Sequence, residues 1–200
     1  MDEKSILVVD YKERFIWLDG VITPSVAYQF KRILTKLNRL KMWPIVFYIR
    51  GIGGDFHATS FMMNEITTSD SPVSVVAHGF VYSGCFTMTQ AGHYKLALPG
   101  TKLTFHPTES VIKKISGDQV QLSQSQLITR LERARLADAV QLSWFLKKGR
   151  PTKEIFDMFQ VETTISLPKA KKLHLIDDYY KKEDFLKDRR IARKLIKAKA

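Results

Sequence analysis

The sequence predicts an α/β fold, in which strands alternate with helices along one chain. Two apolar runs, residues 45–49 and 72–77, are interpreted as buried strands because valine and isoleucine are frequent in them. A glycine turn and a helical stretch follow each run, and this repeated order is typical of α/β proteins. The chain has 200 residues, of which 44% are hydrophobic, which is enough for one domain with a substantial core.

The first expected elements are two short strands and a long helix. Residues 6–9 and 14–18 are expected to be strands, with Asp19-Gly20 ending the second one. Pro24 fits the first turn of a helix, where its missing N–H is not needed. This helix is expected to extend to about Lys41, because apolar residues recur at helical spacing: Val26, Phe30, Ile33, Leu34, Leu37 and Leu40.

Each of the two buried runs leads into glycine. After the first run, residues 51–55 contain three glycines, and a helix is expected from there to about Thr67. After the second run, Gly79 permits a tight turn. Residues 83–90 are then expected to form a helix that ends at Gly92.

The remaining elements follow from breaks in the pattern. Residues 118–148 contain neither glycine nor proline and are rich in glutamine, leucine, arginine and alanine, so one long helix is expected there. Shorter elements are expected as strands at residues 93–98, 102–105 and 176–180, and as helices at residues 152–159 and 168–173.

Positive charge is concentrated at the C-terminal end. The net charge is +12, and residues 181–200 hold nine Lys and Arg against three Asp and Glu, so half of the surplus lies in this tail. A solvated charge run is the simpler expectation, and contact with an acidic partner, nucleic acid or a neighbouring subunit is the alternative. Without zinc-like Cys/His spacing or an aromatic–basic RNA motif, nucleic acid is not an expected partner. The tail could fray, or form a basic amphipathic helix that uses Phe185, Ala192, Leu195 and Ile196.

Cysteine usage and the N-terminal residues bear on the compartment. Cys85 is the only cysteine, so an intrachain disulfide is impossible and a reducing compartment is expected. The first residues are polar and acidic with no long apolar stretch behind them, which argues against a signal peptide. No window approaches the roughly 18 apolar residues that a membrane span needs. We expect a soluble, cytoplasmic protein.

Ser83 is the first candidate for chemistry. It lies where a buried strand is expected to meet a helix, so its hydroxyl would stand clear of the sheet. The free N–H groups and the positive dipole end of the helix favour an oxyanion nearby. The alternative is that Ser83 only caps the helix.

Two further segments point to the same edge of the sheet. Gly53-Gly54 follows one expected strand, Ser83 the next and His106 a third. The ends of successive strands converge in an α/β domain, so a serine, a base and backbone N–H groups would meet there, as acyl transfer requires. Taken singly, the glycines fit an ordinary turn and His106 fits a capped or buried histidine.

Several segments resemble the proteolytic subunit of the Clp protease. Residues 48–54 are similar to its strand and glycine turn, residues 79–83 to its nucleophile segment, and residues 98–106 to the segment that ends in the catalytic histidine. Residues 14–20 resemble its early strand, and residues 165–177 a late stretch. The matches run in the family's order from about residue 12 to 178, which makes them more specific together than any single motif.

The resemblance implies a crotonase-like fold of repeated β-β-α units. It makes residues 1–180 a Clp-type peptidase domain, residues 118–148 a handle helix between stacked rings, and residues 181–200 a basic tail that has no recognised counterpart. Family members form two seven-membered rings around a chamber that an ATP-driven AAA+ unfoldase feeds. It further implies a homo-oligomer, a peptide or unfolded-protein substrate, and neither cofactor nor metal.

The same resemblance assigns roles in the site. Ser83 would be the nucleophile, His106 the base, and Glu162 the acid that orients the imidazole, where the family usually has Asp. Glutamate is longer by one methylene, and a displacement of about 1 Å can lower a rate on the order of a hundredfold. Asp157, on a neighbouring helix, is an alternative orienter.

The oxyanion donors expected from the resemblance are backbone N–H groups. They belong to Gly54 (or Gly53) and Gly84. Gly51-Ile52 replaces the Ser-Pro that precedes the paired glycines in the family, and Tyr82 and Gly84 also differ from the family's neighbours of the serine. The segment before Tyr11 is shorter than the family's axial-loop region, so an unfoldase that uses such loops would bind differently or not at all.

The leading hypothesis is a self-compartmentalised serine peptidase that hydrolyses peptide bonds without ATP. A second hypothesis is a noncatalytic subunit that keeps the fold for assembly, which the glutamate at position 162 favours. A third is a related phage-type or signal-peptide peptidase, whose Ser/Lys dyad would need Lys95 or Lys102 near Ser83. An acyl-CoA enzyme shares the architecture but would leave Ser83 and His106 unexplained.

Overall fold

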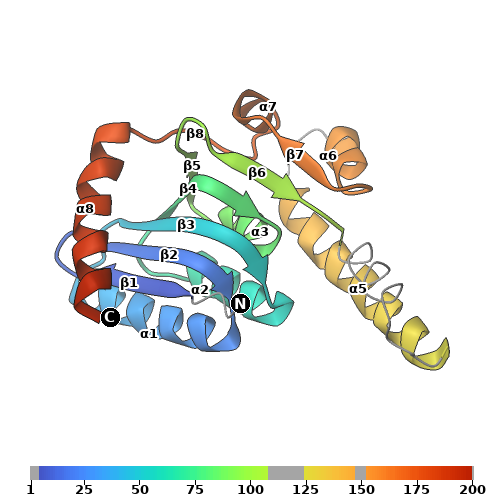
Figure 1. Cartoon of the computed structure of the whole chain (residues 1–200), viewed down its shortest axis with the longest axis horizontal. Coiled ribbons are helices and arrows are strands. Elements are labelled where there is room, and N and C mark those ends of the chain that lie inside the picture. Colours follow the sequence, from blue (N-terminus) through green and yellow to red (C-terminus); the bar gives the residue numbers. More distant parts are fainter. Residues whose placement is uncertain (1–4, 108–123, 147–151, 200) are drawn as a thin grey trace.

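The computed structural model describes residues 5–107, 124–146 and 152–199, and in these ranges the chain forms one eight-stranded sheet with helices around it (Figure 1). The strands are β1 Ile6–Asp10, β2 Phe15–Ile22, β3 Ile45–Gly54, β4 Val73–Tyr82, β5 Tyr94–Ala97, β6 Lys102–Phe105, β7 Thr163–Ile165 and β8 Asp178–Tyr179. The helices are α1 Pro24–Leu40, α2 Phe56–Thr67, α3 Gly84–Thr89, α5 Gln124–Phe145, α6 Thr152–Met158, α7 Leu167–Lys172 and α8 Lys182–Lys199. The predicted α/β class is therefore confirmed.

The centre of the sheet is parallel and its edges are mixed. The main order is β1-β2-β3-β4-β5-β8, with β1 antiparallel to β2 and the others parallel. Strand β4 pairs with two partners in turn: Ser74–Ala77 lie beside β5, and Phe80–Tyr82 lie beside β6. Strand β7, which the sequence analysis did not predict, pairs antiparallel with β6. Strand β4 thus brings the end of β6 next to its own carboxyl end.

Three strands are longer than predicted because glycine bends them without ending them. Strand β2 continues past Asp19-Gly20 to Ile22, and β3 includes its glycines as far as Gly54. Strand β4 passes through Gly79, where a tight turn was expected, and ends at Tyr82. Register shifts between Asp19 and Val21 and between Ile49 and Gly51 let the pairing resume beyond each irregularity. The expected turns are bulges, and the strands carry the site residues further along the sheet.

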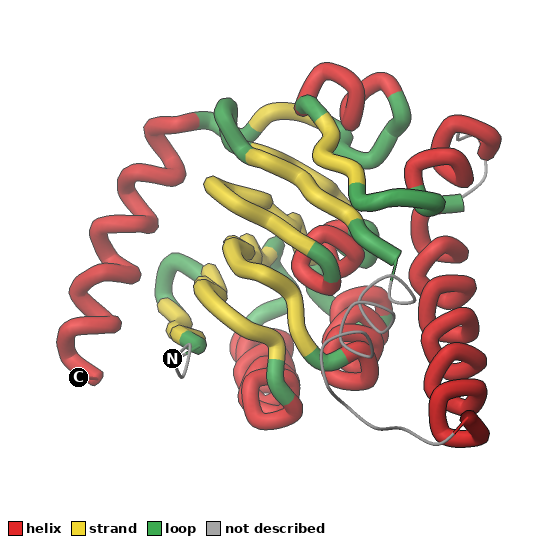
Figure 2. The backbone as a smooth tube through the Cα atoms, turned by 45° about the vertical axis from the view of Figure 1, so that its right-hand side comes forward, coloured by secondary structure: helices red, strands yellow, loops and turns green. Residues whose placement is uncertain are grey.

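Helices α1, α2 and α3 cover one face of the sheet and enclose the main core. Thr23 caps α1 by accepting a hydrogen bond from the N–H of Val26, and Pro24 lies in the first turn, as predicted. Figure 2 shows these helices on one side of the strands and α8 on the other. Large side chains that this core buries completely include Phe30, Phe47, Phe86, Ile16 and Leu34.

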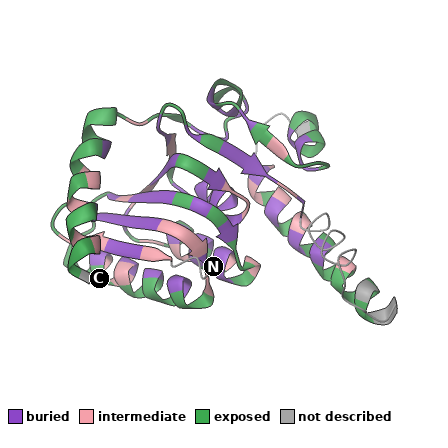
Figure 3. Ribbon diagram, viewed as in Figure 1, coloured by how far each residue is buried: buried purple, intermediate pink, exposed green. Residues whose placement is uncertain are grey.

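Helix α8 covers the opposite face, where it completes a second, aromatic cluster. Its buried Phe185 lies 5.4 Å from the ring of Trp17 and 5.8 Å from that of Tyr48, centroid to centroid. The Tyr48 hydroxyl donates to Asp188 of α8 at 2.6 Å. Residues 182–199 are therefore helical and not frayed, with the apolar face on the sheet and the charged face exposed (Figure 3).

Helix α5 projects from the body of the domain in Figure 1. It occupies the central part of the predicted helix 118–148, whose two ends lie outside the described residues. Ala134 and Phe145 are buried, whereas the side chain of Leu136 is 67% exposed, so the apolar residues of this helix do not all face its own domain. Within the described ranges, no helix is both long and apolar enough to span a membrane.

Candidate active site

The corner between β4 and α3 holds Ser83 in an unusual backbone conformation. Its φ is +53° and its ψ −126°, values that residues other than glycine rarely adopt. Its N–H donates to the carbonyl oxygen of Thr104 on β6 at 2.9 Å, which ties the corner to the neighbouring strand. Although Ser83 occupies the N-cap position, its side chain makes no capping hydrogen bond. The hydroxyl is therefore left for another role.

The end of β3 touches this corner closely enough that only glycine fits. Gly53 has a φ of +92°, and a Cβ atom built on it would lie 2.7 Å from the nitrogen of Gly84 and 2.8 Å from the Cβ of Ser83. Real Cβ contacts are essentially never so short. The glycine turn and the serine corner thus form one packed unit.

Gly84 in turn fits against α2. A Cβ atom on Gly84 would lie 2.7 Å from the Oγ1 atom of Thr59, whose hydroxyl donates to the carbonyl of Asp55 at 2.8 Å. Asp55 caps α2 by accepting from the N–H of Ala58 at 2.7 Å. Gly84 begins α3, so its N–H has no acceptor within the helix. The start of the helix is fixed by contacts from two other elements.

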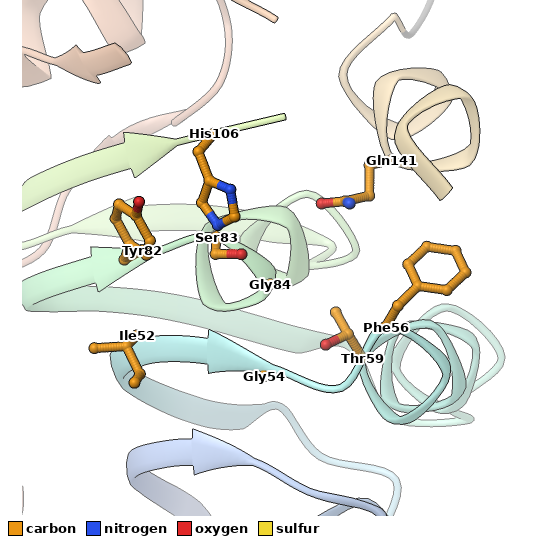
Figure 4. A pocket seen from close by; sticks show the side chains of 9 residues that line it. All are labelled: Ile52, Gly54, Phe56, Thr59, Tyr82, Ser83, Gly84, His106 and Gln141. Carbon is orange, nitrogen blue, oxygen red and sulfur yellow. The ribbon is translucent and has the colours of Figure 1, made fainter. Parts of the chain in front are cut away.

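These elements enclose a cavity of about 400 Å³, which Figure 4 shows from close by. Ser83 and His106 both lie on its wall, together with the expected donors Gly54 and Gly84; Gly53 packs behind them. Most of the accessible wall is apolar. The other lining residues were not predicted from the sequence; they are Ile52, Phe56, Thr59, Tyr82 and Gln141.

His106 follows β6, and in Figure 4 its imidazole points toward Ser83. Its Nδ1 atom lies 3.2 Å from the carbonyl oxygen of Pro107. A carbonyl can only accept, so this contact requires the tautomer in which Nδ1 carries the hydrogen. The Nε2 atom is then free to accept a proton.

The ring of Tyr82 lies between His106 and Glu162. It stacks on the imidazole with 4.8 Å between ring centroids, and its hydroxyl donates to Oε2 of Glu162 at 3.0 Å. Burial, and then the hydrogen bond to Glu162, raise the pKa of Tyr82 to about 12, so the phenol remains protonated. Among the described contacts, Glu162 has no hydrogen bond to His106.

The other candidates lie outside this cavity. Asp157 forms an exposed ion pair with Lys153 at 2.8 Å along α6. Lys95 pairs with Asp177, and Lys102 is exposed at the start of β6. No lysine belongs to the described lining of the cavity, so a serine–lysine dyad lacks its base there.

Fold and site together define an α/β protein with a serine and a histidine in one cavity at the carboxyl ends of parallel strands. The family model described as Clp protease matches residues 2–183. The chain therefore belongs to the Clp protease family, as the resemblance predicted.

Solved structures agree with this fold. A point mutant of ClpP1 from Listeria monocytogenes has a TM-score of 0.65 at 20% identity, covering 87% of this chain and 95% of the other. The ClpP protease catalytic domain from Plasmodium falciparum has a TM-score of 0.63 at 17% identity, covering 86% of this chain and 87% of the other. A search of curated proteins found no match.

Proposed function

We propose that this chain is a serine peptidase of Clp type in which Ser83 attacks the carbonyl carbon of a peptide bond. His106 accepts the hydroxyl proton through Nε2 and returns it to the leaving amine. Water then hydrolyses the acyl-enzyme, so no cofactor is needed. The observation that carries the proposal is that a serine hydroxyl that makes no capping hydrogen bond shares one cavity with an imidazole whose Nε2 atom carries no hydrogen.

Backbone N–H groups would stabilise the oxyanion. Gly84 offers an N–H that has no acceptor within α3, and Gly54 offers an N–H from the end of β3. Donors built into a packed backbone need little reorganisation when charge develops.

Glu162, the proposed acid, would act on His106 through Tyr82. The carbonyl of Pro107 already selects the tautomer of His106. Glu162 holds the Tyr82 hydroxyl, and the tyrosine ring holds the imidazole plane by stacking. Glu162 would then be a positioning residue whose influence on His106 passes through an aromatic ring.

The assembly proposal follows from family membership. We expect homo-oligomeric rings, for which the exposed side chains of Leu136 and Val140 on α5 offer apolar contact area. An AAA+ unfoldase would supply unfolded protein to such a ring. Analytical ultracentrifugation measures whether the chain assembles into rings. Degradation of a folded substrate in the presence of ATP and a candidate unfoldase tests whether an unfoldase supplies unfolded protein to the ring.

Labelling with a fluorophosphonate tests the nucleophile directly. The full chain should become labelled, and peptide mass mapping should place the adduct on Ser83. Ser83→Ala should abolish labelling, whereas Ser25→Ala, a matched change at an exposed position of α1, should leave the rate unchanged. A folded, assembled protein that takes no label would contradict the proposal.

A noncatalytic subunit is the second candidate, and the hydrogen bond between Glu162 and Tyr82 is what favours it. In that case the acid serves packing, and Ser83→Ala would leave both peptide cleavage and assembly unchanged. The labelling rate separates the two candidates, since only an activated serine reacts faster than Ser25.

A further inference from the structure

A second cavity, which is more polar than the Ser83 cavity, lies between α8 and the sheet. Its volume is about 190 Å³, and it shares no lining residue with the Ser83 cavity. Trp17 and His78 contribute from the sheet, and Ala192 and Ile196 from α8. The lining is mixed, with slightly more polar than apolar accessible surface. A cavity of this size is below the range of drug-sized ligand sites, roughly 300–1,000 Å³, and suits a small group.

Three arginines and one aspartate set the charge of this cavity. Arg50 forms two hydrogen bonds with Asp19, one of them from Nε at 2.8 Å, so these two charges offset each other. Arg189 and Arg193 lie four residues apart on α8, which places them on the same face of the helix. Neither has an ion-pair partner among the salt bridges of the described residues. Three arginines against one aspartate leave the described lining of the cavity with a surplus of two positive charges.

His78 lines the same cavity with a buried imidazole. The residue is 5% exposed, and its Nε2 atom has no hydrogen-bond partner in the structure. Burial, and then the charges of Arg50 and Arg189, lower the pKa of His78 to about 3, so the ring is neutral near pH 7. A neutral imidazole still has one N–H to donate. Buried polar atoms are rarely left unpaired, so this nitrogen is expected to have a partner, which is either water or a bound group.

We propose that this cavity binds a phosphate group, free or as part of a small phosphate monoester, between α8 and the sheet. The guanidinium groups of Arg189 and Arg193 and the Nε2–H of His78 would donate to its oxygens. Several acceptor oxygens on one compact anion match this set of donors. The bound group would connect α8 to the sheet, and the inference does not depend on peptidase activity.

Thermal unfolding of the full chain tests the proposal. Sodium phosphate should raise Tm progressively with concentration, beyond sodium chloride at equal ionic strength, because a ligand that binds only the folded state stabilises it. Glycerol phosphate should act similarly if the cavity takes a monoester, and only inorganic phosphate should act if it takes the free ion. No shift beyond that in chloride would overturn the proposal.

A pair of matched variants tests whether phosphate binds in this cavity. Arg193→Gln should weaken phosphate binding, measured by calorimetry, about tenfold or more, since a charge-assisted hydrogen bond is lost. Arg190→Gln makes the same change of charge at an exposed position of α8 outside the cavity, and should leave the affinity within about twofold. Equal losses in both variants would show a general charge effect and overturn the proposal.

Nitrogen NMR of the unmodified protein gives a readout without mutation. The Nε2 signal of His78 should shift on addition of phosphate, whereas the signals of the exposed His57 should not. An unchanged His78 signal at saturating phosphate would remove this histidine from the site and contradict the proposal as stated.

Discussion

The Ser83 cavity and the α8 cavity differ in whether backbone or side chains form them. Backbone forms the first one: a serine at positive φ, a glycine against which no Cβ fits, and the start of a helix. Side chains form the second one, and they come from residues far apart in the chain, such as Trp17, His78 and Arg193. A site built from backbone leaves local marks in a sequence, because glycines and turn residues must stand at fixed positions. A site built from distant side chains leaves none.

Removal of the proposed base should produce the largest change. His106→Gln takes away the proton acceptor but keeps a side chain of similar size, so we expect kcat/KM for a peptide substrate to fall about 10²–10⁴-fold. His57→Gln, on the exposed side of α2, is the matched control and should change nothing. Equal activity of both variants would leave the Ser83 cavity without a base.

A substitution between α8 and the sheet should change mainly the stability of the protein. Phe185→Ala removes the aromatic anchor of α8, and we expect a loss of about 3 kcal/mol in the free energy of unfolding, measured with urea. Leu186→Ala, at the next and more exposed position, should cost much less. Peptide cleavage by the folded Phe185→Ala variant should be unchanged. A large loss of activity would show that the two regions are coupled.

At the Ser83 cavity, a single added carbon atom should instead lower activity. In Gly53→Ala the new Cβ would displace Ser83 and Gly84, so we expect about a hundredfold loss of kcat/KM. Gly100→Ala is a demanding control, because Gly100 also has a positive φ, +84°, but no atom lies within 4 Å of the added carbon. It should lower stability by about 1 kcal/mol and leave activity unchanged. Similar kcat/KM values for Gly53→Ala and Gly100→Ala would mean that the close packing of Gly53 against Ser83 and Gly84 is not essential for activity.

The sequence predicts the backbone part of the molecule better than the side-chain part. The start of α1 follows from Thr23 and Pro24, and the meeting of Ser83 with His106 follows from the convergence of parallel strands. The predicted strand end at Gly79 is wrong, because a glycine bulge and a glycine turn look alike in a sequence.

Other features could not be predicted because no local pattern encodes them. Strand β7 has three residues, too few for a period. The hydrogen bond between Tyr82 and Glu162 joins residues 80 positions apart. The choice of α8 between a docked helix and a frayed tail depends on Trp17 and Tyr48, which lie in distant strands.

Acid should weaken the α8 side through His78. The arginines Arg50, Arg189 and Arg193 and the carboxylate of Asp19 line its cavity, and burial holds its pKa at about 3, against 6.5 in an unfolded chain. Between these two pKa values the unfolded state binds more protons than the folded state. The free energy of unfolding therefore decreases as the pH falls from about 7 toward 3. The slope reaches at most about 1.4 kcal/mol per pH unit.

Urea unfolding across this pH range, in chloride without phosphate, measures the effect. His78→Leu should flatten the slope, whereas His57→Leu should keep it. A slope that persists in His78→Leu would assign the acid sensitivity to other groups.

The smallest effect concerns how Glu162 reaches His106. If its influence passes through the tyrosine, Tyr82→Phe and Glu162→Gln each remove the same hydrogen bond, and each should lower kcat/KM by no more than about tenfold. The double variant should then be no worse than either single one, because both changes break one interaction. If Glu162 contacts His106 directly during turnover, Glu162→Gln should be far more damaging than Tyr82→Phe, and the two effects should add. That result would make the tyrosine contact a resting arrangement that substrate or assembly displaces.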